Sequence, residues 1–262
     1  MTKSFDQHRK DIVEIGRRIY QLGYVAAFDG NISVRLENGD VLATPTAMSK
    51  GFMAEDDLVV VDPEGRLVNG KQKVSSEIGM HLLIYQLRSD VQAVVHAHPP
   101  CSTGYAAAGV PLNKAILAEV VLVLGCIPLT RYGTTGTAEL TDAIRDYVPE
   151  HDALLLANHG VVTYGSNVFL AHAKMETVEH FARISLTTRI LGHETLLSGE
   201  DVDKLMVARE KYGIQGPLKI GEGCPNIQEE DPESRITLTK SQLVDIIQSA
   251  VIALKDRPGS KS

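Results

Sequence analysis

Hydrophobic residues follow a helical spacing in the first part of the chain and form short, turn-bounded runs in the part that follows. Ile12, Ile15 and Ile19 recur on one face of a helix, because their spacing matches 3.6 residues per turn. Ser4 can cap the start of this helix, and Gly23 ends it. The pattern therefore predicts an amphipathic helix that packs one face against the body of the protein.

The short apolar runs predict strands, and the longer capped segments predict helices. Asn38-Gly39 between two such runs is typical of a hairpin turn. The predicted strands cover residues 32–36, 41–44, 58–61, 93–98, 120–124, 127–129, 153–157 and 161–164. The further predicted helices cover residues 76–88, 137–147, 167–191 and 198–212. This mixture favours an α/β or α+β domain in which helices cover a central sheet.

Beyond this body the pattern changes. Residues 217–235 are rich in Pro, Gly and acidic residues and show no period, as is typical of a linker. Thr239 and Gln242 form a capping box for a final helix with an apolar stripe. We expect a body over residues 1–216, the linker, and an amphipathic helix with a polar tail over residues 236–262. The stripe docks on this chain or a neighbouring subunit, or serves as a detachable targeting or assembly helix.

Composition narrows the class of protein. The 262 residues carry a formal net charge of −7 without a dense Lys/Arg block, which argues against a nucleic-acid-binding protein. The longest apolar runs are too short to cross a bilayer, and the first residues lack the apolar region of a secretion signal. Three widely spaced cysteines argue against a disulfide framework. These features predict a cytoplasmic globular protein.

Three histidines stand where apolar strands end. His96 and His98 lie two residues apart, so strand alternation places them on one face. For this pair alone, a buried histidine beside an exposed one is the competing interpretation. His159 follows a second apolar run, in the sequence Asn158-His159-Gly160. Three histidines from two strand ends are typical of a catalytic zinc site with one open position.

A second group of polar residues surrounds a predicted helix start. Ser75 and Ser76 precede the helix, where free backbone N–H groups and hydroxyls can bind an anion. Ordinary helix capping is the alternative, and both roles use the same donors. The loops with Asn31 and Thr46 have similar chemistry. Glu77 lies beside this group, and near a divalent cation it can ligate the metal or move a substrate proton.

Six motifs occur in order that resemble the class II aldolase/adducin family: GNISVR (30–35), LATPTA (42–47), SSE (75–77), AVVHAH (93–98), YGTTGTAEL (132–140) and NHGVV (158–162). The resemblance extends from about residue 8 to about residue 214. It implies that residues 1–216 are a catalytic domain with a three-layer α/β fold. In this fold helices cover a central, mostly antiparallel, nine-stranded sheet, and four copies assemble as a homotetramer.

The resemblance also implies a set of metal ligands. By matching motifs, His96, His98 and His159 resemble the residues that hold Zn2+, or another divalent metal, in this family. Glu77 resembles the family's acid/base residue, which also serves as the fourth metal ligand before substrate binds. A catalytic zinc site is therefore what the resemblance leads us to expect.

Substrate contacts follow in the same way. Asn31, Thr46, Ser75 and Ser76 resemble the family's phosphate-binding residues. Tyr212, in a segment similar to the family's C-terminal stretch, is the expected residue for closing the site near the aldehyde. The family's second tyrosine, contributed across a subunit interface, has no counterpart in residues 114–124.

The implied reaction is zinc-dependent cleavage of a deoxyketose 1-phosphate, such as L-fuculose 1-phosphate, to dihydroxyacetone phosphate and an aldehyde such as L-lactaldehyde. The alternatives on the same scaffold are a sugar-phosphate 4-epimerase, a phosphotetronate decarboxylase, a methylthioribulose-phosphate enzyme and a non-enzymatic adducin-like interaction domain. The final helix resembles peptides that deliver enzymes into bacterial microcompartments. It predicts a shell-protein partner, and a location in the cytoplasm or inside such a compartment.

Two residues depart from the aldolase branch of the family. Asp29 stands where that branch has a small residue, and Ala47 stands where it has glycine. A carboxylate near a phosphate repels it unless the carboxylate points away. Asp29 therefore weakens the match to the phosphate-binding motif of that branch.

Overall fold

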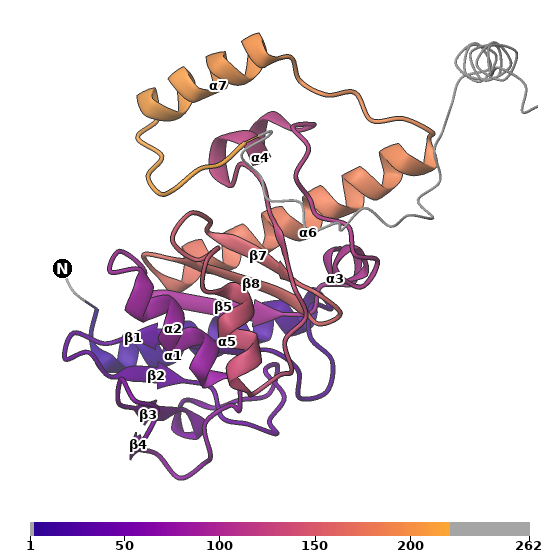
Figure 1. Ribbon diagram of the computed structural model, residues 1–262. Helices are drawn as coiled ribbons and strands as arrows, with labels where there is room; N and C mark the ends of the chain where they lie inside the picture. Colours follow the sequence, from indigo (N-terminus) through magenta and orange to yellow (C-terminus); the bar gives the residue numbers. More distant parts are fainter. Residues whose placement is uncertain (1–2, 221–262) are drawn as a thin grey trace, which may run out of the picture. The chain divides into compact units, whose positions relative to one another are not determined.

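Residues 3–220 are described by the computed structural model of the chain, and a sheet lies at their centre (Figure 1). Its strands are β1 (Asn31–Arg35), β2 (Val41–Ala43), β3 (Val59–Val61), β4 (Leu67–Asn69), β5 (Ala93–Ala97), β6 (Leu129–Thr130), β7 (Ala153–Leu156) and β8 (Gly160–Gly165). They pair in the order β4-β3-β2-β1-β5-β8-β7-β6. Among the described strands, β6 and β7 are parallel, and every other neighbouring pair is antiparallel. The expected mostly antiparallel sheet is confirmed, with eight strands here instead of nine.

Helices connect the strands and cover the sheet. They are α1 (Phe5–Gln21), the 3-10 helix η1 (Glu55–Asp57), α2 (Ile78–Leu87), α3 (Pro100–Ala107), α4 (Ala118–Val123), α5 (Ala138–Ile144), α6 (Val168–Ile190) and α7 (Gly199–Lys211). Four of the described helices begin with a side-chain cap, and Ser4 is confirmed as the cap of α1. Ser4, Thr137, Asn167 and Ser198 each accept a hydrogen bond from a backbone N–H in the first turn of α1, α5, α6 and α7.

Two hydrophobic clusters lie on opposite faces of the sheet, as alternation along β5 requires. Val95 packs in the cluster that contains Met175 of α6 and residues of α1. The neighbouring Val94 packs in the cluster with Met80 of α2 and Ile144 of α5. The fold therefore has three layers, helices on each side of one sheet, and the expected architecture is confirmed.

The prediction of a strand at residues 120–124 is wrong, because this segment lies mostly in α4. A short apolar run fits a buried helix turn as well as a buried strand, so its pattern alone cannot decide. Tertiary packing decides here. Val120 and Val121 are buried, and the guanidinium of Arg209 in α7 donates a hydrogen bond to the carbonyl oxygen of Leu122.

Residues 217–220 have no helix or strand, while the rest of the predicted linker and the predicted final helix lie outside the described residues.

Cys101 is a free cysteine, whereas Cys126 is disulfide-bonded, which corrects the expectation drawn from the cysteine spacing. Within residues 3–220, no helix is both long and apolar enough to span a membrane.

Candidate active site

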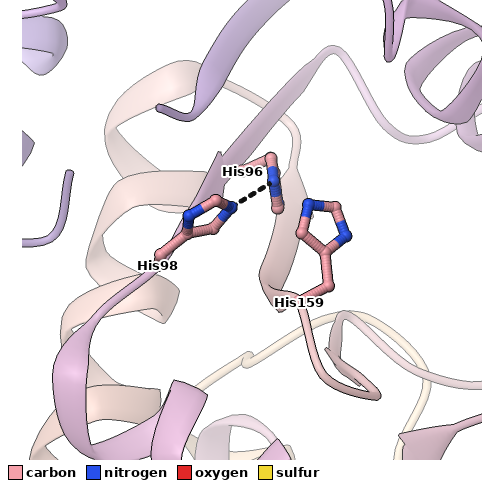
Figure 2. Close-up of side chains that lie close together, drawn as sticks. All are labelled: His96, His98 and His159. Atoms are coloured by element: carbon pink, nitrogen blue, oxygen red, sulfur yellow. Dashed lines mark hydrogen bonds between the residues drawn. The ribbon is translucent and has the colours of Figure 1, made fainter. Parts of the chain in front are cut away.

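The centre of the sheet positions the three histidines. His96 is in β5, where it pairs with Asn31 of β1 on one side and Val162 of β8 on the other. His98 follows the end of β5, and His159 lies in the tight turn between β7 and β8. The three rings face one another in Figure 2, with centroids 4.7–5.1 Å apart. The predicted convergence of the strand ends is what brings these side chains together.

Two glycines make this close approach of the rings and strands feasible. A Cβ atom on Gly160 would lie 2.4 Å from Cδ2 of His98, well inside contact distance. Gly30 has a φ of +70°, and a Cβ there would lie 2.7 Å from the carbonyl oxygen of His96. Asn158 adopts the left-handed conformation, with φ of 54°, in the turn before His159. Asparagine tolerates this conformation better than most residues, which explains the Asn-His-Gly sequence.

The ring nitrogens are arranged for a divalent metal. One nitrogen from each of His96, His98 and His159 lies within 4.8 Å of the other two. The Nε2 atoms of His96 and His98 are 3.1 Å apart. Tetrahedral zinc with Zn–N bonds of about 2.0–2.1 Å separates its nitrogen ligands by about 3.4 Å. Nδ1 of His96 donates to the carbonyl oxygen of Val161 at 2.8 Å, which leaves Nε2 unprotonated toward the site. The donor set therefore fits zinc.

Glu77 completes the site from the start of α2. Its Oε1 lies 3.1 Å from Nε2 of His159, and its Oε2 lies 3.4 Å from Nε2 of His96. The amide Nδ2 of Asn31 donates to Oε2 at 2.8 Å. The carboxylate is thus close enough to serve as a fourth ligand or to exchange a proton with a bound substrate.

Burial sets the charge of these groups. Burial lowers the pKa of His96 to about 3 and also lowers the pKa of His98, so both rings are neutral at neutral pH. Neutral imidazole is the form that binds metals. Burial opposes ionisation of Glu77, but hydrogen bonds from His159 and from the amide of Asn31 favour the charged form. The pKa of Glu77 therefore lies below its usual value, and the carboxylate is ionised.

A polar cavity of about 280 Å³ opens beside these groups. It brings together all four predicted phosphate-binding residues with Glu77 and two of the three histidines. The cavity is lined by Phe28, Asp29, Gly30, Asn31, Pro45, Thr46, Ala47, Lys50, Ser75, Ser76, Glu77, His98, Thr135 and His159. A small ligand in this space would therefore touch both the candidate metal ligands and the hydroxyl groups.

Asp29, at the rim of this cavity, faces a histidine. Its Oδ2 lies 3.4 Å from Nδ1 of His98, on the side of the ring opposite the converging nitrogens. A carboxylate in this position can orient a metal-binding imidazole and fix its tautomer. Asp29, which stands where the aldolase branch has a small residue, therefore lies beside one of the predicted metal ligands.

The structure does not bring Tyr212 to the cavity. Tyr212 caps the C-terminus of α7, its side chain is 68% exposed, and the cavity is lined by other residues. Its predicted role near the aldehyde remains a prediction.

Two residues at the site were missed from sequence. Lys50 is buried at the cavity, with its ammonium donating to the carbonyl oxygens of Phe28 and Met48. His81 is buried in α2, and its Nε2 lies 2.5 Å from Oδ1 of Asn31. The signal for His81 was its place one helical turn after Glu77, because residues four apart share a helix face. No local pattern marked Lys50.

Replacing Gly160 with alanine is expected to weaken zinc binding about tenfold or more, because the added Cβ must displace the ring of His98. Competition with a chelator on the purified protein measures this affinity. Gly199→Ala is the matched control, since a Cβ there meets no atom within 4 Å. Equal zinc affinity in the two variants would contradict the role given to Gly160.

Comparison with known proteins agrees with the fold and the motifs. The family model described as Class II Aldolase and Adducin N-terminal domain matches residues 10–186. The chain is 32% identical over 212 residues to 5-deoxy-D-ribulose 1-phosphate aldolase of Bacillus thuringiensis serovar kurstaki, covering 80% of this chain and 98% of that one. It is 32% identical over 203 residues to 3-oxo-tetronate 4-phosphate decarboxylase of Pectobacterium atrosepticum, covering 75% and 91%.

A solved structure of L-fuculose 1-phosphate aldolase gives the same result in three dimensions. It superposes with a TM-score of 0.73 and 29% sequence identity, covering 80% of this chain and 98% of that chain. The family match spans more than half of the residues, and it includes the strands and turns that carry the three histidines. The chain belongs to the class II aldolase and adducin family.

Proposed function

We propose that this protein is a zinc-dependent aldolase that cleaves a deoxyketose 1-phosphate of the L-fuculose 1-phosphate type to dihydroxyacetone phosphate and an aldehyde such as L-lactaldehyde. The observation that carries the proposal is the position of Glu77. Its carboxylate lies within 3.4 Å of ring nitrogens of both His96 and His159, and it lines a cavity that also contains Ser75 and Ser76. An adducin-like interaction domain does not need this arrangement.

The compounds named for the relatives share one piece of chemistry. L-Fuculose 1-phosphate, 5-deoxy-D-ribulose 1-phosphate and 3-oxo-tetronate 4-phosphate each have a ketone between a phosphorylated carbon and a hydroxylated carbon. Breaking the next carbon–carbon bond in any of them leaves the same enediolate, that of dihydroxyacetone phosphate. A site that stabilises this enediolate is therefore suited to both reactions, and the leaving group distinguishes them.

The residues of this chain divide the work of the cleavage. A zinc ion bound by His96, His98 and His159 would supply electrostatic stabilisation for the negative charge that develops on the substrate oxygens. Glu77, which is ionised, takes the proton of the hydroxyl on the carbon that becomes the aldehyde. This proton then goes to the other carbon of the broken bond, which stays in dihydroxyacetone phosphate. One proton is removed and one is returned, so the overall reaction is balanced.

The hydroxyl groups and the lysine of the cavity are suited to binding a phosphate group. Ser75, Ser76 and Thr46 provide hydroxyl groups there, and Asn31 provides an amide. Lys50 provides a positive charge, and within residues 3–220 it forms no ion pair with a carboxylate. Burial lowers the pKa of Lys50 to about 8, against the opposing effect of nearby acidic groups, so the ammonium is mostly charged at pH 7. A buried charge is stabilised by an opposite charge, and a bound phosphate would supply one to the ammonium of Lys50.

Lys50→Met is expected to raise KM for the sugar phosphate about 10- to 100-fold, the range typical of losing a hydrogen bond to a charged group. Steady-state kinetics on the phosphorylated sugar and its unphosphorylated form measure the effect. The unphosphorylated form serves as the internal control, because it has no charge for Lys50 to meet. Equal losses of kcat/KM on both sugars would show that Lys50 only supports the loops.

A decarboxylase is the second candidate, favoured by the similarity to the Pectobacterium enzyme. The two reactions share dihydroxyacetone phosphate as a product and differ in the other product. Incubation with L-fuculose 1-phosphate and, separately, with 3-oxo-tetronate 4-phosphate distinguishes them. We expect L-lactaldehyde from the first substrate, at a kcat/KM above that for CO2 release from the second. The reverse order would make the decarboxylase the better assignment, and no turnover of either would direct the search to epimerase and methylthioribulose-phosphate substrates.

We infer a cytoplasmic homotetramer, in which Tyr212 helps to close the site near the aldehyde. The segment 236–262 binds a microcompartment shell protein through its apolar stripe. Light scattering measures the oligomeric state, and imaging of the chain with and without residues 236–262 tests the shell partner. Unchanged co-localisation with shell proteins after the deletion would rule this partner out.

A further inference from the structure

Behind the cavity, five polar side chains form an unbroken line of hydrogen bonds into the core. Asn31 joins Glu77 to His81, with 2.8 Å between its Nδ2 and Oε2 of Glu77 and 2.5 Å between its Oδ1 and Nε2 of His81. Ser33 continues the line, with its Oγ 2.7 Å from Nδ1 of His81 and 2.7 Å from the hydroxyl of Tyr85. Ser33, His81 and Tyr85 are all buried, so solvent does not compete for these contacts.

The line results from the match between a strand and a helix. Asn31 and Ser33 are two residues apart in β1, and alternation puts both side chains on one face of the sheet. Glu77, His81 and Tyr85 are spaced four residues apart from the start of α2, so they share the facing side of that helix. Each side chain of one element thus reaches a side chain of the other.

The chemistry of the groups fixes the direction of every proton in the line. The amide of Asn31 presents its NH2 group to Glu77, because its Nδ2 donates to the carboxylate oxygen Oε2. Oδ1 of Asn31 then faces Nε2 of His81, and this nitrogen must carry the hydrogen because an amide oxygen cannot donate. Burial lowers the pKa of His81 to about 4, so the ring is neutral and Nδ1 accepts from the hydroxyl of Ser33. Ser33 in turn accepts from Tyr85.

We infer that His81 is a positioning residue that holds the side-chain amide of Asn31 in one orientation, with its NH2 group toward Glu77 and the cavity. In the reversed orientation, Oδ1 of Asn31 would face the carboxylate of Glu77, and its NH2 group would face the N–H of His81. Both contacts are repulsive, and His81 contributes one of them. The inference rests on the proposed function only in that Asn31 and Glu77 act on the substrate.

The first test is spectroscopic and needs no turnover. In the full-length chain with uniform 15N labelling, we expect the ring of His81 to be in the tautomer protonated at Nε2. The signals of His81 are assigned as those missing from the spectrum of His81→Asn. A ring protonated at Nδ1, or at both nitrogens at pH 7, would overturn the inference.

The second test compares two substitutions that each keep half of the ring's polar contacts. His81→Gln can place a donor near the position of Nε2, whereas His81→Asn can reach only the position of Nδ1. We expect His81→Asn to lower kcat/KM about tenfold or more, the effect of leaving a buried polar group unpaired. We expect His81→Gln to stay within about threefold of the unaltered chain. Equal losses in both variants would overturn the inference.

A double-mutant cycle separates positioning from general support of the fold. In the Asn31→Ala background, His81→Asn is expected to have little further effect on kcat/KM, because the group it positions is gone. A full tenfold further loss would show that His81 acts by another route. Zinc content should stay equal in all variants, since His81 makes no contact with the three histidines in the hydrogen bonds described. If the unaltered chain cleaves no sugar phosphate, the proposed function fails, while the tautomer measurement still decides the role of His81.

Discussion

Glu77→Gln is expected to lower kcat by about 10²- to 10⁴-fold, the range typical of losing a general acid/base. The amide has nearly the shape of the carboxylate and can still accept the hydrogen bond from Asn31, but it cannot take a proton from the substrate. The three histidine ligands are untouched, so the variant should still bind zinc. Steady-state kinetics and metal analysis of the same preparation measure both quantities.

Glu64→Gln is the matched control for this substitution. Glu64 is exposed and pairs with Arg66 at the surface, so its change should leave kcat unaltered. Full activity in Glu77→Gln would remove Glu77 from the mechanism. A large loss of zinc together with activity would instead assign Glu77 to metal binding alone.

His159→Ala is expected to abolish zinc binding at micromolar metal and to reduce turnover to background. The substitution leaves two nitrogen ligands where three converge, and it removes the ring that contacts Oε1 of Glu77. Loss of even an outer-sphere partner typically costs 10- to 100-fold in metal affinity, so loss of a direct ligand should cost more than about 100-fold. Competition with a chelator and a kinetic assay with added zinc measure the two effects.

His180→Ala provides the comparison for this variant. His180 is an exposed residue of α6, and its removal should change neither zinc affinity nor kcat. Zinc bound at one ion per chain in His159→Ala, with kcat within threefold of the unaltered chain, would contradict the three-histidine site.

The elements that the sequence predicted correctly are those with a strong local signal. Helix α1 combines a buried stripe with the cap Ser4, and both act within a few residues of each other. Helix α3 was missed because its sequence, Pro-Cys-Ser-Thr-Gly-Tyr-Ala-Ala, has little helix preference. A distant residue stabilises it. The buried carboxylate of Glu179 in α6 accepts hydrogen bonds from the backbone N–H groups of Cys101 and Ser102.

The same distinction holds at the site. Alternation along a strand placed His96 and His98 on one face, and the matching turn after a second strand added His159. The contacts of Lys50 and His81 come from other elements of the fold. Lys50 binds the carbonyl oxygen of Phe28, and His81 binds a side chain of β1. The first contact depends on how two loops fold together and the second on how β1 and α2 pack, so the sequence does not name either partner.

The proposed mechanism is tested most directly by measuring the exchange of protons of dihydroxyacetone phosphate for deuterium in D2O. The exchange is followed by NMR, with zinc-loaded protein and no aldehyde present. If the site forms the enediolate with Glu77 as the base, one of the two hydroxymethyl protons should exchange for deuterium. A chelator should stop the exchange, and restored zinc should restart it. In Glu77→Gln the exchange rate should fall by a factor of about 10² or more. An unchanged proton signal with zinc-loaded protein, or equal exchange in Glu77→Gln, would contradict the account.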